Sequence, residues 1–348
     1  MLLSIILLLL TFYFLALVCD YFFVPALEKI SKKLELSSEF AGATLMAVWS
    51  SAPELFTSLF AVLNPTVNSS LWAGTIVWSA LFNILVIIWA AALVRNAKIN
   101  RQPVARDTLF YCISILLLLS MLRDGQVVLR EVIVLVVLYV VYVYVAKKRS
   151  TRLNYSDDGR DDDEWEEEEP TNILAKWSIY ILKKIIPSYK WKHYRWTFVV
   201  SILFIAGLSH IMVESAVHLA ELFSIPPAII GLTILAAGTS IPDLLSSVAV
   251  AKKWKGDMAI SNAIGSNIFD ILFGLWFPYM LYFFIFGMNE SIPVNSDNLT
   301  SSIILLFASV LVVIAMLVMK KRNIGKPIWY ILIGLYIIYV SWTVWQVI

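Results

Sequence analysis

Residues 233–247 read TILAAGTSIPDLLSS, and residues 44–58 read TLMAVWSSAPELFTS. The two stretches align without a gap and are identical at six of fifteen positions. Each places an acid directly after a proline, Glu54 in the first copy and Asp243 in the second. A repeat of this kind within one chain predicts an architecture built from two related halves.

A second pair of related stretches follows the first. Residues 74–85, GTIVWSALFNIL, match residues 261–272, SNAIGSNIFDIL, so that Ser79 aligns with Ser266 and Asn83 with Asp270. In both copies the serine precedes the acid or amide by four residues, and residues at this spacing share one face of a helix. Each half of the chain is therefore expected to contribute a helical hairpin that carries polar side chains.

The composition places these hairpins in a membrane. Of the 348 residues, 60% are apolar and 15% are charged, whereas a soluble domain carries about 25% charged residues. A helix that crosses a bilayer needs about 20 apolar residues. Ten apolar runs approach or exceed this length, near 2–18, 39–62, 71–94, 107–122, 129–146, 195–220, 226–250, 258–285, 299–319 and 327–347. We therefore expect an all-α polytopic membrane protein with about ten transmembrane helices, surrounded by the lipid bilayer and without a nucleic-acid partner. The first run is interpreted as a retained helix, with a cleaved signal as the alternative.

The loops between these runs predict an orientation. Lys and Arg are enriched in every second loop, beginning with the loop after the first run, and cytoplasmic loops carry such an excess. Both termini are then external, although the loop at 123–131 is ambiguous. Five helices, an odd number, separate the two copies, so the second copy enters the membrane from the opposite side. The chain is thus interpreted as two inverted five-helix repeats, an arrangement that many secondary transporters use to form a site at mid-membrane.

Three regions follow from this division. Residues 1–146 form the first transmembrane half, 147–193 an acidic cytoplasmic loop, and 194–348 the second transmembrane half. The loop holds ten acids between Asp157 and Glu169, a composition typical of a disordered, solvated linker. A low-affinity cation sensor is the alternative, although no EF-hand loop is present.

The repeated polar residues predict cation binding. A charge at the centre of a membrane helix costs roughly 2.5–3.5 kcal/mol or more, so it usually serves a function. The candidate ligands supply only oxygen, without Cys or His, which favours calcium and sodium over zinc or copper. Taken alone, each could also be a polar residue that packs two helices together. The set comprises Glu54, Asp243, Asp270, Asn83, Ser50, Ser51, Thr239, Ser240, Ser79 and Ser266.

These stretches resemble the two alpha-repeats of the cation/calcium exchanger superfamily, and most closely those of the potassium-dependent sodium/calcium exchangers. The resemblance implies a secondary active antiporter that exchanges calcium for sodium, with potassium as a further transported ion. It implies that Glu54 and Asp243 are the central calcium and sodium ligands and that Asp270 is the acid associated with potassium dependence. The hydroxyl groups and Asn83 would complete the sites. No cofactor and no enzymatic activity are implied, and the membrane is the plasma membrane or that of an intracellular organelle.

Two tryptophans depart from the family pattern. Trp49 and Trp78 replace glycines whose counterparts in the second half are Gly238 and Gly265. One hypothesis is that both indoles fill space at the ion site and impair transport, which would leave an ion-binding relative. The alternative is that both rings point away from the site and pack against lipid or another helix.

Two further rival functions remain open on sequence grounds. Carboxylates also carry protons, so a calcium/proton exchanger on the same fold is one alternative. An intramembrane enzyme is another, because His210, Glu214 and His218 follow one another at four-residue intervals and could bind a metal.

Overall fold

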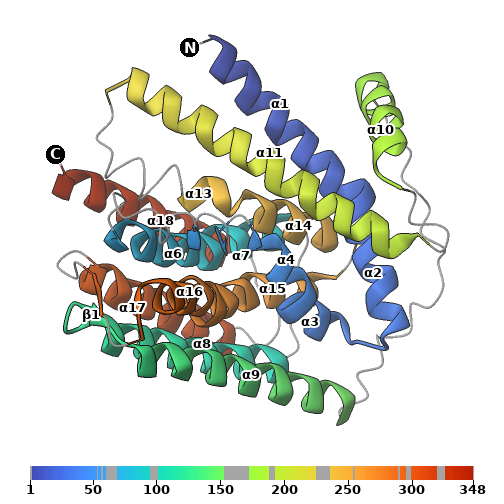
Figure 1. The fold of residues 1–348 in the computed structure, drawn as a ribbon. Coiled ribbons are helices and arrows are strands. Elements are labelled where there is room, and N and C mark those ends of the chain that lie inside the picture. The colour runs from blue at the N-terminus through green and yellow to red at the C-terminus, as the bar shows by residue number, and fades with distance from the viewer. Residues whose placement is uncertain are drawn as a thin grey trace.

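The structure is a computed structural model of the chain. It describes residues 2–52, 54–55, 58–59, 69–94, 101–152, 172–187, 193–224, 236–253, 255–288, 291–294, 299–319 and 326–347. The described part is a bundle of helices with one two-stranded sheet (Figure 1).

The N-terminal helix is longer than the sequence predicts. It continues without a break through α1 (Leu2–Val18), the π-helical turn η1 (Cys19–Phe23) and α2 (Val24–Lys33). Composition marks only residues 2–18, because α2 carries charged residues and lacks a continuous apolar run. α11 (Tyr194–Leu222) lies beside α1, in the most extensive contact between two elements of the described chain. The pair crosses one side of the molecule (Figure 1).

The first polar hairpin lies in the interior of the bundle. Its first arm consists of α3 (Ser38–Ala41), η2 (Gly42–Met46) and α4 (Ala47–Ser50). Its second arm consists of α6 (Ser69–Phe82), η3 (Asn83–Ile87) and α7 (Ile88–Val94). α3 begins after Ser37, whose side chain accepts a hydrogen bond from the Phe40 amide over 3.3 Å, as expected for a helix N-cap.

The second polar hairpin repeats the order of parts in its second arm, an α-helix, a π-helical turn and an α-helix. It contains α13 (Ala236–Thr239), α14 (Ile241–Lys252), α15 (Gly256–Phe269), η5 (Asp270–Gly274) and α16 (Trp276–Phe286). The π-helical turns η3 and η5 begin at Asn83 and Asp270, which the sequence repeat aligns with each other. Every residue of α15 from Met258 to Phe269 is buried, so this helix forms the centre of the bundle. α17 (Leu299–Met319) and α18 (Lys326–Val347) complete this half.

Backbone contact joins the two hairpins. A Cβ atom on Gly265 of α15 would lie 2.6 Å from the carbonyl oxygen of Ala43 in η2. A Cβ atom on Gly42 would lie 2.5 Å from the carbonyl oxygen of Met258. Only glycine permits so close an approach, because it has a hydrogen where every other residue has a β-carbon.

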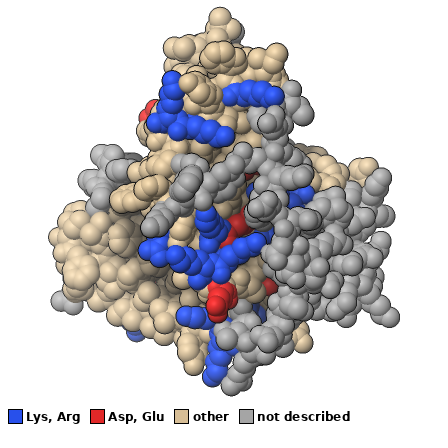
Figure 2. Space-filling model, turned by 90° about the vertical axis from the view of Figure 1, so that its right-hand side faces the viewer, with Lys and Arg blue, Asp and Glu red and all other residues tan. Residues whose placement is uncertain are grey.

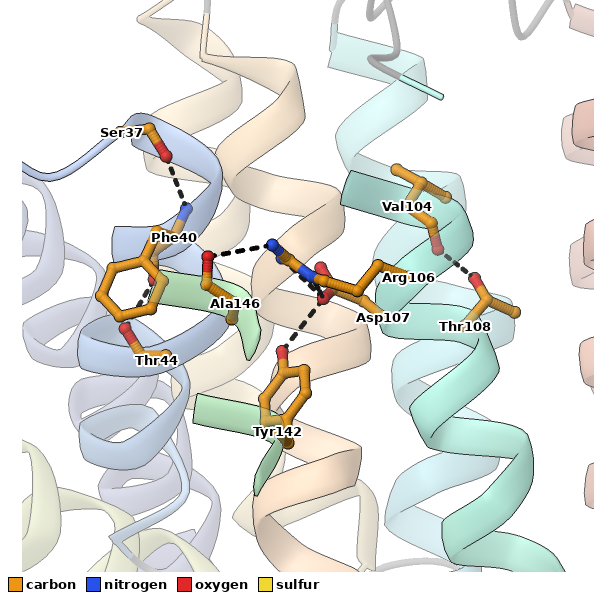
Figure 3. Close-up of polar contacts among 9 residues, drawn as sticks. All are labelled: Ser37, Phe40, Thr44, Val104, Arg106, Asp107, Thr108, Tyr142 and Ala146. Atoms are coloured by element: carbon orange, nitrogen blue, oxygen red, sulfur yellow. Dashed lines mark hydrogen bonds and ion pairs between the residues drawn. The ribbon is translucent and has the colours of Figure 1, made fainter. Parts of the chain in front are cut away.

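Two further helices cover the opposite side of the bundle, α8 (Arg101–Leu122) and α9 (Leu129–Arg152). A buried ion pair joins Arg106 to Asp107, with 2.7 Å between Nη2 and Oδ1. Arg106 also donates to the carbonyl of Ala146 over 3.3 Å, and the Tyr142 hydroxyl donates to Asp107 over 3.3 Å (Figure 3). These contacts tie the start of α8 to α9.

The segment at 147–193, expected to be a loop, contains helical structure. α9 continues to Arg152, and α10 (Ile173–Ile185) is a separate amphipathic helix that packs against α1. Ile179 and Leu182 of α10 are buried. Asn172 caps this helix by accepting from the Leu174 amide over 3.2 Å. The acidic stretch before it lies outside the described residues.

The only strands of the described chain join two loops. β1 (Gln126–Val127) pairs antiparallel with β2 (Ile292–Pro293), and the Val294 amide donates to the Gly125 carbonyl over 2.9 Å. The ambiguous loop at 123–131 therefore lies at the same end of the molecule as residues 291–294. The side of the membrane that this end faces stays a prediction.

Basic residues gather on a different face of the molecule (Figure 2). The end of α2 approaches the start of α11 there, because the Lys33 ammonium lies 5.6 Å from the centre of the Tyr194 ring. The loop between α14 and α15 meets the same helix, since Lys255 lies 3.2 Å from the carboxylate of Glu28. Three of the loops predicted to be cytoplasmic thus contribute to one face.

Six helical segments in the described residues are long and apolar enough to cross a membrane. Two shorter apolar helices occupy Thr300–Ala315 and Tyr330–Ser341. The all-α polytopic class is confirmed, whereas ten spans and the inverted relation of the halves stay predictions.

Candidate cation-binding site

Both hairpins interrupt their first arm just before the acid. α4 ends at Ser50, and Ser51 has φ −82° and ψ 9°. α13 ends at Thr239, and Ser240 has φ −85° and ψ 0°. Pro242 then lies in the first turn of α14, where its missing N–H group leaves no helical hydrogen bond unmade. In both halves the break therefore lies three residues before the acid, which is Glu54 in the first half and Asp243 in the second.

The structure brings the predicted residues into the protein interior. None of the ten side chains is more than 3% exposed. The ten are Ser50, Ser51, Glu54, Ser79, Asn83, Thr239, Ser240, Asp243, Ser266 and Asp270. Burial of so many polar groups requires hydrogen bonds or a bound ion in return.

Asp243 is held by donors from both halves. Its Oδ1 accepts from the Ser266 hydroxyl over 3.0 Å, and its Oδ2 accepts from Asn83 Nδ2 over 3.1 Å. Two neutral donors stabilise the carboxylate but leave its charge uncompensated, which favours an arriving cation.

Glu54 is joined to the opposite half through hydroxyl groups. Its Oε1 accepts from Ser240 Oγ over 3.2 Å, and Ser240 Oγ lies 2.7 Å from Ser79 Oγ. The Glu54 carboxylate also lies close enough to Asp270 and Asp243 for their negative charges to act on it. The two hairpins thus place three carboxylates in one region of the interior.

Five buried oxygen atoms at this place have no hydrogen-bond partner in the described chain. They are Ser51 Oγ, Glu54 Oε2, Asn83 Oδ1 and both carboxylate oxygens of Asp270. A buried polar atom without a partner costs about 1–3 kcal/mol, and more when it is charged. Oxygen atoms in this condition suit a hard cation, which would replace the missing partners.

The remaining hydroxyl groups direct their protons toward their own helices. Ser50 donates to the Met46 carbonyl over 2.8 Å, and Thr239 donates to the Ala236 carbonyl over 3.2 Å. Because each proton is engaged there, the oxygen lone pairs remain available to an ion.

The carboxylates alone do not form a compact cluster. The described residues include no group of three Cys, His, Asp or Glu side chains that could hold a metal ion by themselves. A cation at this place would need the neutral oxygens of Ser51 and Asn83 as well, in keeping with the mixed oxygen shells of calcium and sodium.

The alternative metal site on α11 is not formed. His210 and Glu214 lie 3.2 Å apart, but their side chains are 72% and 68% exposed. His218 is exposed as well, and no three-residue group that could hold a metal is found among these described side chains. The hypothesis that these three residues bind a metal is wrong for the described structure.

The two tryptophans contact helices of the surrounding bundle. Trp49 is 38% exposed, and its ring lies edge-on to Phe198 of α11, with 5.9 Å between ring centres. The Trp78 ring is buried against Tyr339 of α18, with 4.4 Å between centres. These contacts support the packing interpretation and oppose the hypothesis that the rings fill the ion site.

The repeat did not reveal two asparagines that join the network. Asn267 Oδ1 accepts from Asn83 Nδ2 over 2.9 Å. Asn262 Nδ2 donates to Ser247 over 2.9 Å, and its Oδ1 lies 3.4 Å from Ser50 Oγ. The aligned positions in the first half are Ala80 and Thr75, so a search for shared residues passes over both. The four-residue spacing from Asn262 to Ser266 is the signal that could have found Asn262.

Comparison with known families gives one match over most of the chain. The family described as sodium/calcium exchanger protein matches residues 4–148 and 193–345. The acidic segment and α10 lie between the two matched ranges.

Among curated relatives, the chain is 28% identical to sodium/potassium/calcium exchanger 4 of Mus musculus, over 96% of this chain and 79% of the relative. It is 32% identical to sodium/potassium/calcium exchanger 5 of Homo sapiens, over 86% of this chain and 75% of the relative. Among solved structures, the sodium-calcium exchanger NCX_Mj soaked with 10 mM Na+ and zero Ca2+ matches with a TM-score of 0.69. That match covers 98% of both chains at 22% identity, so it concerns the fold.

The family match and the long apolar helices together identify the chain as a multi-pass integral membrane protein.

Proposed function

The chain belongs to the sodium/calcium exchanger protein family, and from this premise we propose that it is a secondary active antiporter that exchanges calcium for sodium. The observation that supports this most directly is the group of buried, unpartnered oxygens at Ser51, Glu54, Asn83 and Asp270. Such a group is costly unless a cation occupies it for part of the transport cycle. No chemical transformation is needed, and we do not propose an enzyme.

We propose Glu54 and Asp243 as the central ligands of calcium and sodium. Each comes from one half, and the bonds from Ser240 to Glu54 and from Asn83 to Asp243 cross between the halves. Both halves then contribute to one bound ion, and a change in their relative position would change its coordination. Ser50, Ser51, Thr239, Ser240, Ser79 and Ser266 add neutral oxygens.

The charge balance gives a reason for obligatory exchange. An empty site would leave three carboxylates uncompensated in a low dielectric, which disfavours any conformation that encloses them. One calcium and one potassium ion together carry three positive charges, equal to the charge of Glu54, Asp243 and Asp270. This equality is the reason to propose potassium co-transport, with Asp270 as its ligand.

The proposed frame is two inverted five-helix repeats, 1–146 and 194–348, joined by an acidic cytoplasmic loop at 147–193. The basic face that includes Lys33 and Lys255 would be cytoplasmic. Protease added outside intact cells should then leave the 147–193 segment uncut, and cleavage there would overturn the orientation.

The decisive test is calcium uptake by proteoliposomes that contain the purified protein and internal sodium. Uptake should require the outward sodium gradient, and external potassium should raise it. A matched preparation of Glu54→Gln should show none. Uptake driven by a pH gradient without sodium would instead establish the calcium/proton exchanger, and calcium binding without any uptake would indicate a transport-impaired relative.

A further inference from the structure

Tyr111 lies outside both hairpins and is linked to the site through Asn267. It lies on α8, is completely buried, and its hydroxyl accepts a hydrogen bond from Asn267 Nδ2 over 3.0 Å. Tyr111 belongs to neither repeated stretch and touches none of the ten predicted ligands through a hydrogen bond in the described chain. Its connection to the site runs through two amide side chains.

The first amide, Asn267, has every polar atom engaged. Its two N–H groups donate to the Ala80 carbonyl over 3.1 Å and to the Tyr111 hydroxyl over 3.0 Å. Since an amide nitrogen has only two hydrogens, both are used. Asn267 Oδ1 therefore faces Asn83, from whose Nδ2 it accepts over 2.9 Å.

The second amide, Asn83, is fixed in turn. Its Nδ2 donates to Asn267 Oδ1 and, over 3.1 Å, to Asp243 Oδ2. Both hydrogens are again used, so Asn83 Oδ1 is the atom left over. It is buried without a hydrogen-bond partner among the described residues, and it is the natural neutral ligand of an ion bound beside Asp243.

We propose that Tyr111 is a positioning residue for cation binding, whose hydroxyl holds the Asn267 amide and thereby orients Asn83 Oδ1 toward the ion. The proposal rests on the proposed function of this site. If Asn267 rotated by half a turn, its NH₂ group would face the NH₂ group of Asn83, and neither could accept. The Ala80 carbonyl, which can only accept, opposes that rotation, and the Tyr111 hydroxyl accepts from the second N–H and so fixes the plane of the Asn267 amide.

The test is Tyr111→Phe, which removes the hydroxyl and keeps the ring. Loss of one hydrogen bond of this kind corresponds to about a five- to tenfold weaker calcium half-saturation, with the maximal rate changed less than about twofold. Calcium binding is measured on the purified full-length protein by equilibrium titration, and transport by sodium-driven uptake in proteoliposomes. The matched control is Tyr142→Phe, since Tyr142 is equally buried and donates to Asp107 instead (Figure 3). It should leave the calcium half-saturation unchanged.

A double-mutant cycle separates positioning from a general loss of stability. In an Asn83→Ala background, Tyr111→Phe should have no further effect on calcium half-saturation, because the atom it orients is gone. Equal effects of Tyr111→Phe in both backgrounds, or wild-type calcium binding in the single variant, would overturn the proposal. Absence of sodium-driven uptake by the wild-type protein would overturn the proposed antiport instead, and the binding titration would still decide the role of Tyr111.

Discussion

Replacing Asp243 by asparagine should weaken calcium binding about a thousandfold while leaving the fold intact. The side chain keeps its size, and the new amide can be accommodated by its two neighbours. The amide oxygen can accept from Asn83 Nδ2 as Oδ2 does now, over 3.1 Å. The amide nitrogen can donate to Ser266, whose hydroxyl accepts as readily as it donates.

The size of the effect follows from the lost charge. Two unit charges about 4 Å apart attract by about 4 kcal/mol at an effective dielectric constant of 20, so a divalent ion loses about 8 kcal/mol. The variant no longer desolvates the Asp243 carboxylate on binding calcium and no longer has its repulsion with Glu54 and Asp270. We halve the lost attraction to allow for the avoided desolvation and the relieved repulsion. The net loss is then about 4 kcal/mol, which corresponds to about a thousandfold lower calcium affinity.

The assay pairs calcium titration with thermal unfolding of the ion-free protein in detergent. The control is Asp107→Asn, a second fully buried acid, which is paired with Arg106 at 2.7 Å (Figure 3). Breaking a buried ion pair costs about 3–5 kcal/mol, so this control should lower the unfolding temperature and leave calcium affinity unchanged. Asp243→Asn should do the opposite, with an unfolding temperature equal to or above wild type, since it relieves repulsion among three acids.

The two variants thus dissociate stability from binding in both directions. Calcium affinity within threefold of wild type in Asp243→Asn would refute the assigned role of this carboxylate. An unfolding temperature that falls as far as in Asp107→Asn would refute the argument that its charge is uncompensated without an ion.

Three further variants test other parts of the structure. Asp270→Asn should make calcium uptake independent of potassium, because both oxygens of this acid lack hydrogen-bond partners in the described chain; full potassium dependence in flux assays would place that ion elsewhere. Gly265→Ala should destabilise the protein by about 1–3 kcal/mol, since the new methyl group would lie 2.6 Å from the Ala43 carbonyl; an unchanged denaturation midpoint would show that the hairpins separate easily. Trp49→Gly combined with Trp78→Gly should lower the unfolding temperature without raising the sodium-driven rate, and a faster rate would show that the indoles restrict the ion path.

Much of the candidate site was predictable because its residues recur in the two halves. The pairing of Glu54 with Asp243, each with hydroxyls one turn away, is visible in the letters of the chain, and the interior position of both acids agrees with that prediction. The identification of the family also rested on these stretches and is confirmed. Their roles as ligands stay predictions.

The residues that were missed are those without a counterpart in the other half. Asn267 aligns with Ala80, and Tyr111 lies on a helix outside the repeat. Their contribution arises from contacts between helices far apart in the chain, which periodicity within one helix does not encode. The extension of the first helix to Lys33 was missed for a different reason, because α2 is polar and its continuity depends on packing against α11.

The paired π-helical turns mark the two places where a hairpin can lose a residue without turning the helix that follows. η3 and η5 start at Asn83 and Asp270, and a π turn of this kind corresponds to one inserted residue in an α-helix. Removing one residue from Ile271–Gly274 would restore an ordinary α-helical turn and leave α16 in its present direction, so Phe283 would stay buried and Phe284, now 69% exposed, would stay outside. The same deletion within the regular part of α16 would turn the residues after it by about 100°. Single-residue deletions should therefore be tolerated better by the following helix at these two turns than in the α-helical stretches beside them, and related sequences that differ in length within the hairpins should differ there.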